Sequence, residues 1–193
     1  MKMSKRLSLV AAALAVQLGA VGAEIDAVAL QPPLATETLR CTEHYVGQLQ
    51  GLGDELGTDC AIARVVEVHG RSRMRDYEGD GSRNDHWYSW MKPVLAPCDG
   101  SISKVYINSK VNEPGVIGSP PASYVVVDCT NDVHVILVHI QQPDVREGDR
   151  IVAGHTIATV ESSGMSRSPH ILVGAWRGKT PLQLRWDQRE MGE

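Results

Sequence analysis

From Pro93 onward the chain is a series of short apolar runs separated by turn residues. Turn signals such as Asp99-Gly100, Asn131-Asp132 and Ser163-Gly164 fall between the runs. Strands that are this short and this close together are typical of an antiparallel β-sandwich or half-barrel. We therefore expect a mainly β fold, with strands at 93–96, 100–107, 123–128, 133–139, 150–152, 156–160 and 170–176.

The pattern before this region is more varied. Residues 24–34 show no clear period and are expected to be a loose lead-in. Apolar positions recur at near-helical spacing over 36–50, which predicts one short amphipathic helix ended by the glycines of 51–53. These positions are Leu39, Tyr45, Val46 and Leu49. A β-branched run predicts a strand at 61–68, and the charged, glycine-containing stretch 70–85 is typical of a solvated loop.

The first 23 residues have the organisation of a secretory signal peptide. Three basic residues precede an apolar run at 7–21, and small residues at 21–23 form a cleavage site. The apolar run is too short and too rich in Ala and Gly to favour a spanning helix. We therefore expect a secreted or periplasmic protein, with no stable membrane insertion after cleavage.

The charge balance bears on the class of partner. The whole chain has a formal net charge of -4, and loss of the basic leader makes the mature chain still more negative. This balance argues against nucleic acid as the natural partner.

Four cysteines remain in the mature chain: Cys41, Cys60, Cys98 and Cys129. An even number in an oxidising compartment predicts disulfides, and four cysteines allow three pairings among which sequence order cannot choose. We favour Cys41–Cys60 within the N-terminal segment and Cys98–Cys129 across the β domain. Neither a C-x-x-C nor a zinc-finger spacing is present, so the cysteines are interpreted as structural.

Several phrases in order resemble the lysostaphin/LytM-type zinc endopeptidases, which cut peptidoglycan cross-links. The phrases are PVLAPCDG at 93–100, YVVVD at 124–128, VHI at 138–140, VREGDRIVAGHTIA at 145–158 and SGMSRSPH at 163–170. The resemblance covers roughly residues 84–187. It implies the LytM-type fold, with a barrel-sandwich-like core, and a site that holds Zn²⁺.

The resemblance also implies roles for particular residues. His139 and His170 match the two histidines that lie beside the metal-bound water and act as catalytic residues. Near the position of the first two ligands the chain offers Asp85 and His86, of which Asp85 is favoured by counting back from Pro93. The third ligand position, two residues after His170, is Leu172, which has no lone pair for a metal. A complete site would require both Asp85 and His86 to turn inward, or His69 or His134 to move into the site.

Aromatic residues beside these positions are candidates for a substrate groove. Trp87, Tyr88 and Trp90 are expected to line it, and their alternative role is to fill the core of a chain that has no Phe. His139 likewise has an alternative role as a hydrogen-bonded core residue in an apolar strand.

Together these observations predict an N-terminal extension at 24–83, a peptidase-like β domain at 84–187 and a tail at 188–193. Two functions remain open. The first is an impaired peptidase-like protein that binds peptidoglycan, its stem peptides or a partner such as a cell-wall hydrolase, because ligand positions are substituted. The second is an active zinc metalloendopeptidase.

Overall fold

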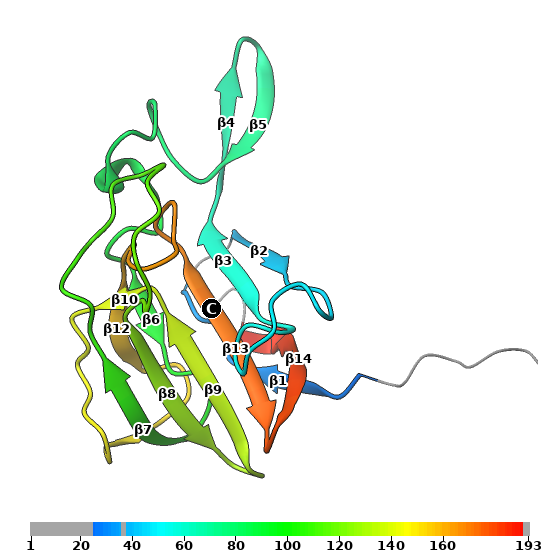
Figure 1. Cartoon of the computed structure of the whole chain (residues 1–193). Helices are drawn as coiled ribbons and strands as arrows, with labels where there is room; N and C mark the ends of the chain where they lie inside the picture. The colour runs from blue at the N-terminus through cyan, green and yellow to red at the C-terminus, as the bar shows by residue number, and fades with distance from the viewer. Residues whose placement is uncertain (1–24, 36–37, 191–193) are drawn as a thin grey trace, which may run out of the picture.

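The computed structural model of the chain describes residues 25–35 and 38–190, and these residues form a mainly β protein (Figure 1). The predicted fold class is therefore confirmed. Among the residues that the structure describes, helical structure is limited to two 3-10 turns, η1 (Asn84–His86) and η2 (Gln188–Glu190). None of the helices in the described ranges is long and apolar enough to cross a membrane. The predicted signal peptide, residues 1–23, lies outside the described residues.

The largest sheet has nine strands and curls around one side of the molecule. Its strands are β1 (Ala27–Leu30), β2 (Leu39–Glu43), β3 (Thr58–Ile62), β7 (Gly100–Tyr106), β8 (Tyr124–Cys129), β9 (Val133–Val138), β11 (Arg150–Ile151), β13 (Ile171–Arg177) and β14 (Thr180–Trp186). β1 pairs with β14 in parallel, and the other pairs are antiparallel. β13 pairs with β9 along one side, and with β3 and then β14 along the other.

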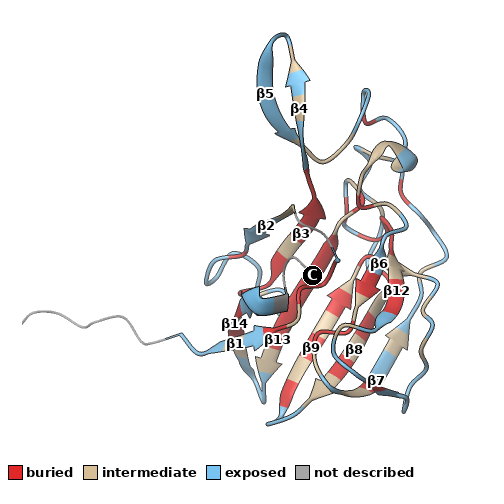
Figure 2. Ribbon diagram, turned by 180° about the vertical axis from the view of Figure 1, so that it is seen from behind, coloured by how far each residue is buried: buried red, intermediate tan, exposed pale blue. Residues whose placement is uncertain are grey.

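The core lies between this sheet and a small second sheet, β10 (Ile140–Gln141), β12 (Thr156–Val160) and β6 (Pro93–Leu95). In strands β8 and β9 buried residues alternate with half-buried ones, so every second residue points into the core, whereas residues 171–175 of β13 are all buried (Figure 2). The core-facing side chains from these three strands include Val125, Val127, Val135, Leu137 and Val173, all fully buried. The other face of the same strands is therefore free to build a site.

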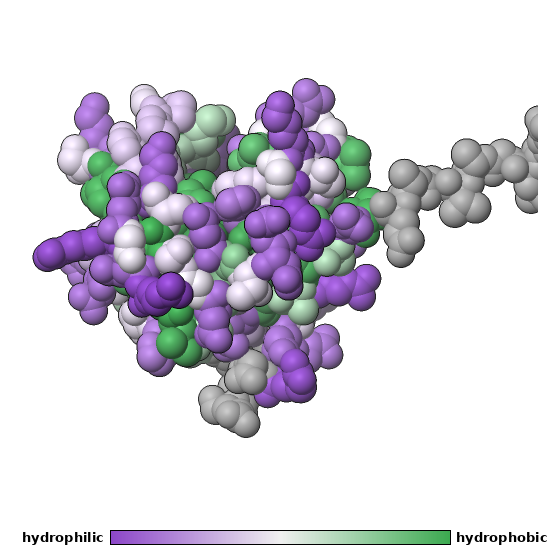
Figure 3. All heavy atoms as spheres, turned by 90° about the horizontal axis from the view of Figure 1, so that it is seen from below, coloured by the Kyte–Doolittle hydropathy of each residue, from purple (hydrophilic) through white to green (hydrophobic). Residues whose placement is uncertain are grey.

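A third unit projects from the body of the molecule. Strands β4 (Arg64–Val68) and β5 (Arg71–Arg75) form an isolated hairpin that extends beyond β3 and is largely exposed (Figures 1 and 2). His69 and Gly70 at its tip have φ of 52° and 71°, the two positive values that a two-residue type I′ turn requires. At the end of the molecule opposite this hairpin, hydrophilic side chains cover most of the surface (Figure 3).

The N-terminal region differs from its predicted secondary structure. The helix predicted over 36–50 is wrong for the described part of that range, because residues 39–43 form β2 and residues 46–48 turn. The strand predicted at 61–68 is divided at Ala63 into the ends of β3 and β4, and the predicted loop at 70–85 contains β5. The lead-in at 24–34 contains β1. Strand pairing decides the local structure in each case, with a strand elsewhere in the chain for β1 and β2 and with the adjacent strand of the hairpin for β4 and β5. Propensity alone does not encode this pairing.

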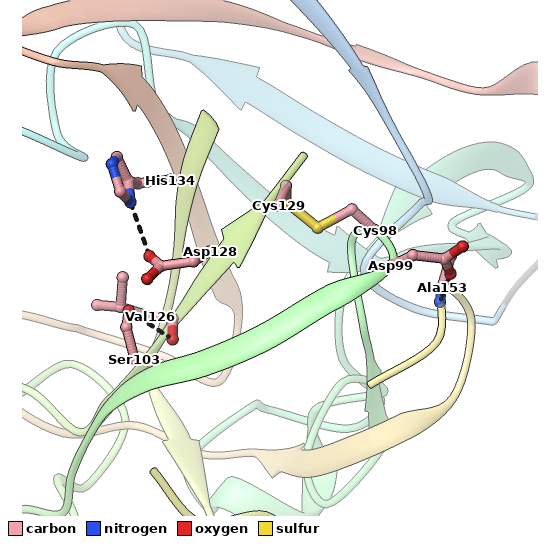
Figure 4. Close-up of a disulfide and its surroundings, with 8 residues drawn as sticks. All are labelled: Cys98, Asp99, Ser103, Val126, Asp128, Cys129, His134 and Ala153. Carbon is pink, nitrogen blue, oxygen red and sulfur yellow. Dashed lines mark hydrogen bonds and ion pairs between the residues drawn. A yellow bond between two sulfur atoms is a disulfide. The ribbon is translucent and has the colours of Figure 1, made fainter. Parts of the chain in front are cut away.

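Both favoured disulfides are present. Cys41 and Cys60 are directly opposite each other on β2 and β3. Cys98 joins Cys129 at the end of β8, next to an ion pair between Asp128 and His134 (Figure 4). The Asp99 carboxylate beside this disulfide accepts a hydrogen bond from the backbone N–H of Ala153. The two disulfides therefore lie in different parts of the large sheet. Cys41–Cys60 joins β2 to β3, and Cys98–Cys129 joins the residues before β7 to the end of β8.

Candidate functional site

A cavity of about 720 Å³ opens on the face of the large sheet that points away from the core. Its floor is one row of side chains that crosses five strands, because residues directly opposite each other in antiparallel strands share a face. The row runs Tyr124, Val138, Leu172, Asp59 and Thr42. The floor is therefore apolar on the β8–β9–β13 side and acidic where β3 joins the sheet.

Asp59 is the centre of the polar part of the cavity. On β3 its neighbours Thr58 and Cys60 are buried, and alternation turns its carboxylate to the cavity face. Oδ2 lies 3.2 Å from His44 Nε2, and Oδ1 lies 3.5 Å from His170 Nε2. Burial raises the pKa of the Asp59 carboxyl, but the hydrogen bonds and charges of His170 and His44 together outweigh this and leave it below its usual value.

The two histidines that flank Asp59 are held by backbone carbonyls. His44 Nδ1 donates to the carbonyl of Asp54 at 2.8 Å, and His170 Nδ1 donates to the carbonyl of Ser168 at 2.7 Å. Each ring is thereby oriented with Nε2 toward Asp59. The result is a chain of imidazole, carboxylate and imidazole across β2–β3 and the start of β13.

His139 lies beside His170, with ring centroids 4.5 Å apart. It is only 6% exposed, and its Nδ1 donates to the carbonyl of Ser163 at 2.9 Å. Burial, followed by the nearby charge of His170, lowers its pKa from 6.5 to about 3. His139 is therefore neutral near pH 7, with Nε2 free of the proton that Nδ1 carries.

A second carboxyl group lies behind His139. Glu161 is buried, its backbone N–H donates to the carbonyl of His139, and its Oε1 has no hydrogen-bond partner among the described residues. Burial raises its pKa, although the hydroxyls of Ser163 and Ser123 act in the opposite direction. A raised pKa favours the neutral carboxyl, which avoids a buried charge next to the histidine pair.

The predicted histidine pair is thus brought together, whereas the predicted metal residues are placed elsewhere. Asp85 and His86 lie on η1, where Asp85 pairs with Arg83 and His86 Nδ1 lies 3.2 Å from Asp80. Neither lines the cavity. This placement lends no support to a ligand role for Asp85 or His86.

Sequence reasoning missed His44 and Asp59 as site residues. His44 falls within 36–50, the range predicted as a helix, and no motif marks it as a site residue. Asp59 carried one signal, a lone carboxylate next to the apolar run that begins at Cys60, but the predicted strand began two residues later. Their approach to each other depends on the pairing of β2 with β3, which becomes visible only in the fold.

The three aromatic residues that were predicted to line a groove lie in different surroundings. Trp87 lines the cavity, packs against Tyr77 with the ring centroids 4.8 Å apart, and donates from its indole nitrogen to the carbonyl of Gly81. Tyr88 instead lies under the guanidinium of Arg64 at 4.3 Å. Trp90 is half-buried and does not line the cavity.

The donor set of this cavity does not fit a catalytic zinc ion. Such an ion takes three protein ligands and keeps one position for water. Four side chains with donor atoms line the cavity, His44, Asp59, His139 and His170, but no three of them are arranged around one point. The position on β13 directly opposite Asp59 is the hydrocarbon side chain of Leu172. Within residues 25–35 and 38–190, no three His, Cys, Asp or Glu side chains are arranged to hold a metal ion.

The neutral state of His139 predicts a pH dependence of stability. Between about pH 6.5 and pH 3 the unfolded chain binds a proton at this position and the folded chain does not. The free energy of unfolding should therefore fall with decreasing pH by about 1.4 kcal/mol per unit from this group alone. The contribution is fully present above pH 6.5 and is lost toward pH 3.

The variant His139→Asn isolates this term, because Asn tolerates the left-handed φ of 65° at this position and does not titrate. Urea unfolding of both proteins at several pH values gives the difference. A parallel pH dependence in the two proteins would show that His139 titrates normally in the folded state.

Comparison with known proteins places the chain in a family. The sequence profile of peptidase family M23 matches residues 88–184. Searching the curated proteins gave no match. Among solved structures, the catalytic domain of the prophage-encoded M23 protein EnpA from Enterococcus faecalis is similar at 19% identity, with a TM-score of 0.48 over 76% of this chain and 86% of that one.

Two further structures are similar at the same level. The catalytic domain of lysostaphin from Staphylococcus simulans has 15% identity and a TM-score of 0.45, over 74% of this chain and 86% of that one. The M23 metalloprotease pseudoalterin, from the deep sea, has 13% identity and a TM-score of 0.48, over 80% and 74%. The family profile spans half of the sequence, and it includes both His139 and His170. The chain belongs to peptidase family M23.

Proposed function

We propose that this protein is a secreted or periplasmic M23 peptidase-like protein that binds peptidoglycan, through its stem peptides, without cutting it efficiently. The observation that carries the proposal is Leu172, which stands on β13 opposite Asp59 and two residues after His170. A zinc ion held by only two protein ligands is bound weakly and does not lower the pKa of a bound water to about 7.

The chemistry of the cavity supports a peptide ligand. Its floor of Tyr124, Val138 and Leu172 suits small apolar side chains, while Asp59 suits an ammonium group. Arg167 on the rim has no carboxylate partner among the described residues and suits a peptide carboxylate. Stem peptides carry groups of all three kinds.

A secreted location is supported by the two disulfides, which persist in oxidising compartments. The expected signal peptide at 1–23 points the same way. A protein partner such as a cell-wall hydrolase is the alternative occupant of the same cavity. The binding experiment below distinguishes this partner from peptidoglycan itself.

The first test is the zinc content of the purified mature protein, measured by elemental analysis after dialysis at neutral pH. We expect far less than one zinc per chain, and no clearing of a peptidoglycan suspension. One zinc per chain together with clearing would overturn the proposal in favour of an active zinc metalloendopeptidase. The observation that favours this second function is the convergence of His44 and His170 on Asp59.

The second test is co-sedimentation with insoluble peptidoglycan. Met165 is 69% exposed and lines the cavity, so Met165→Arg should weaken binding without affecting the core. Val152 is also exposed and lies outside the cavity, which makes Val152→Arg the matched control. Equal binding by the two variants would show that the cavity is not the binding site.

A further inference from the structure

The projecting hairpin β4–β5 has two chemically different faces. One face carries Arg64, Val66, Val68, Arg71, Arg73 and Arg75, which we call the arginine face. The opposite face carries Val65, Glu67, Ser72 and Met74. All four arginines of the hairpin therefore lie on one side, in a chain whose formal net charge is -4.

The four arginines differ in what they contact. At the base, Arg64 lies over the ring of Tyr88 at 4.3 Å and Arg75 lies over Tyr77 at 5.4 Å. Nearer the tip, Arg71 and Arg73 are exposed, and no side chain in the described part of the molecule pairs with either of them. Arg64 and Arg75 are directly opposite each other, which is unfavourable for like charges. Contacts within the described residues therefore account for Arg64 and Arg75, but not for Arg71 and Arg73.

The base of the hairpin is anchored to the body. Tyr77 packs against Trp87 with the ring centroids 4.8 Å apart, and these two residues form an isolated β-bridge. Arg40 pairs with Asp76 directly after β5, and both line the cavity rim. The base of the hairpin is therefore held in place, and β5 runs from the arginine face to the edge of the cavity.

The spacing along β5 selects the shape of an anionic partner. Arg71, Arg73 and Arg75 are alternate residues of an antiparallel strand, so their side chains emerge about 7 Å apart. Two residues of a polypeptide contain six backbone bonds, so an extended chain of six bonds spans about the same length. A polymer with one phosphodiester every six bonds can therefore place a phosphate at each arginine, whose planar fork suits phosphate.

Two other anionic partners fit less well. A bilayer presents lipid phosphates at no fixed spacing along a line, so the regular spacing of the arginines on β5 does not favour it. A single-stranded nucleic acid has the same phosphate spacing, but it is usually held by aromatic side chains that stack on bases, and the arginine face has none.

We propose that the arginine face binds a linear phosphodiester polymer of the cell envelope that carries no bases, with poly(glycerol phosphate) as its simplest form. The polymer lies along β5 and is guided toward the cavity rim. This binding is independent of the metal content of the cavity.

The test is fluorescence anisotropy of end-labelled poly(glycerol phosphate) with the full mature chain at increasing salt. Three phosphate contacts should give a slope of log K against log salt of about −2. The double variant Arg71→Gln/Arg73→Gln should bind about tenfold more weakly at low salt, and its slope should fall to about −0.7. The matched control Arg146→Gln/Arg150→Gln removes the same charge from exposed positions outside the hairpin and should stay within about twofold of the unmodified protein.

Several results would overturn the proposal. These are equal losses in the two double variants, no binding of the polymer, or tighter binding to an oligodeoxynucleotide with the same number of phosphates. Binding to anionic phosphatidylglycerol vesicles but not to the polymer would also overturn it. Because the hairpin is exposed, circular dichroism should show both double variants folded. Failure of this test leaves the zinc and peptidoglycan tests unaffected, since Arg71 and Arg73 do not line the cavity.

Discussion

Replacing Leu172 by His is expected to turn the cavity into a zinc site. Position 172 lies directly opposite Asp59, and His44 Nε2 lies 3.2 Å from the same carboxylate. An imidazole at 172 would supply the third ligand of a His₂Asp set. Loss of a group that merely hydrogen-bonds a ligand costs about 10–100-fold in metal affinity, so a new ligand should raise zinc affinity at least about 100-fold.

Competition with a chromophoric chelator measures this affinity, and two variants control it. Leu172→Phe places a ring of similar shape without a lone pair and should leave zinc binding weak. Leu172→His/Asp59→Asn keeps the new ring but removes the carboxylate charge, and should lose most of the gain. A folded Leu172→His protein with unchanged zinc affinity would show that His44, Asp59 and residue 172 do not form a ligand set.

The strands after Pro93 could be predicted because their burial is local and regular. In β8, β9 and β12 the apolar runs are bounded by turn residues, and the predicted and observed bounds agree within one residue at each end. The N-terminal helix was wrong for a physical reason. Tyr45 and Val46 suggested a buried helical face, but both are exposed, and a strand held opposite Cys60 by Cys41 replaces the start of the helix.

The site could be predicted only in part. His139 and His170 stand in phrases that are continuous in sequence, so their meeting followed from the order of the strands. Counting back from Pro93 favours Asp85, which lies on η1 and does not line the cavity. The hairpin β4–β5 and η1 in fact lie between β3, which carries Asp59, and β6.

Gly174 is the second position at which a single substitution should have a large effect. It lies in the middle of β13, where a strand normally favours a side chain. A Cβ there would lie 1.8 Å from the backbone oxygen of Gly53. Gly53 itself approaches Ile136 and Trp176, so the loop that precedes β3 rests directly on the sheet. The absence of a side chain at 174 is what permits this contact.

This loop positions His44 as well as Asp54. The backbone N–H of His44 donates to the carbonyl of Gly57, and its Nδ1 donates to the carbonyl of Asp54. A methyl group at 174 must push the loop away, because the obstructing atom belongs to the backbone and no rotamer change can relieve it. His44 would then move away from Asp59, and the row His44–Asp59–His170 would lose its first imidazole.

We therefore expect Gly174→Ala to lower the free energy of unfolding by about 3 kcal/mol or more, measured by urea denaturation. Gly51→Ala is the matched control in the same loop, since its Cβ would meet only the Asp54 side chain at 3.4 Å, and should change stability by no more than about 1 kcal/mol. Combined with Leu172→His, Gly174→Ala should also abolish the gained zinc affinity while Gly51→Ala preserves it. Full zinc affinity in Leu172→His/Gly174→Ala would mean that His44 does not depend on the contact between Gly53 and Gly174, and that the sheet alone positions the ligands.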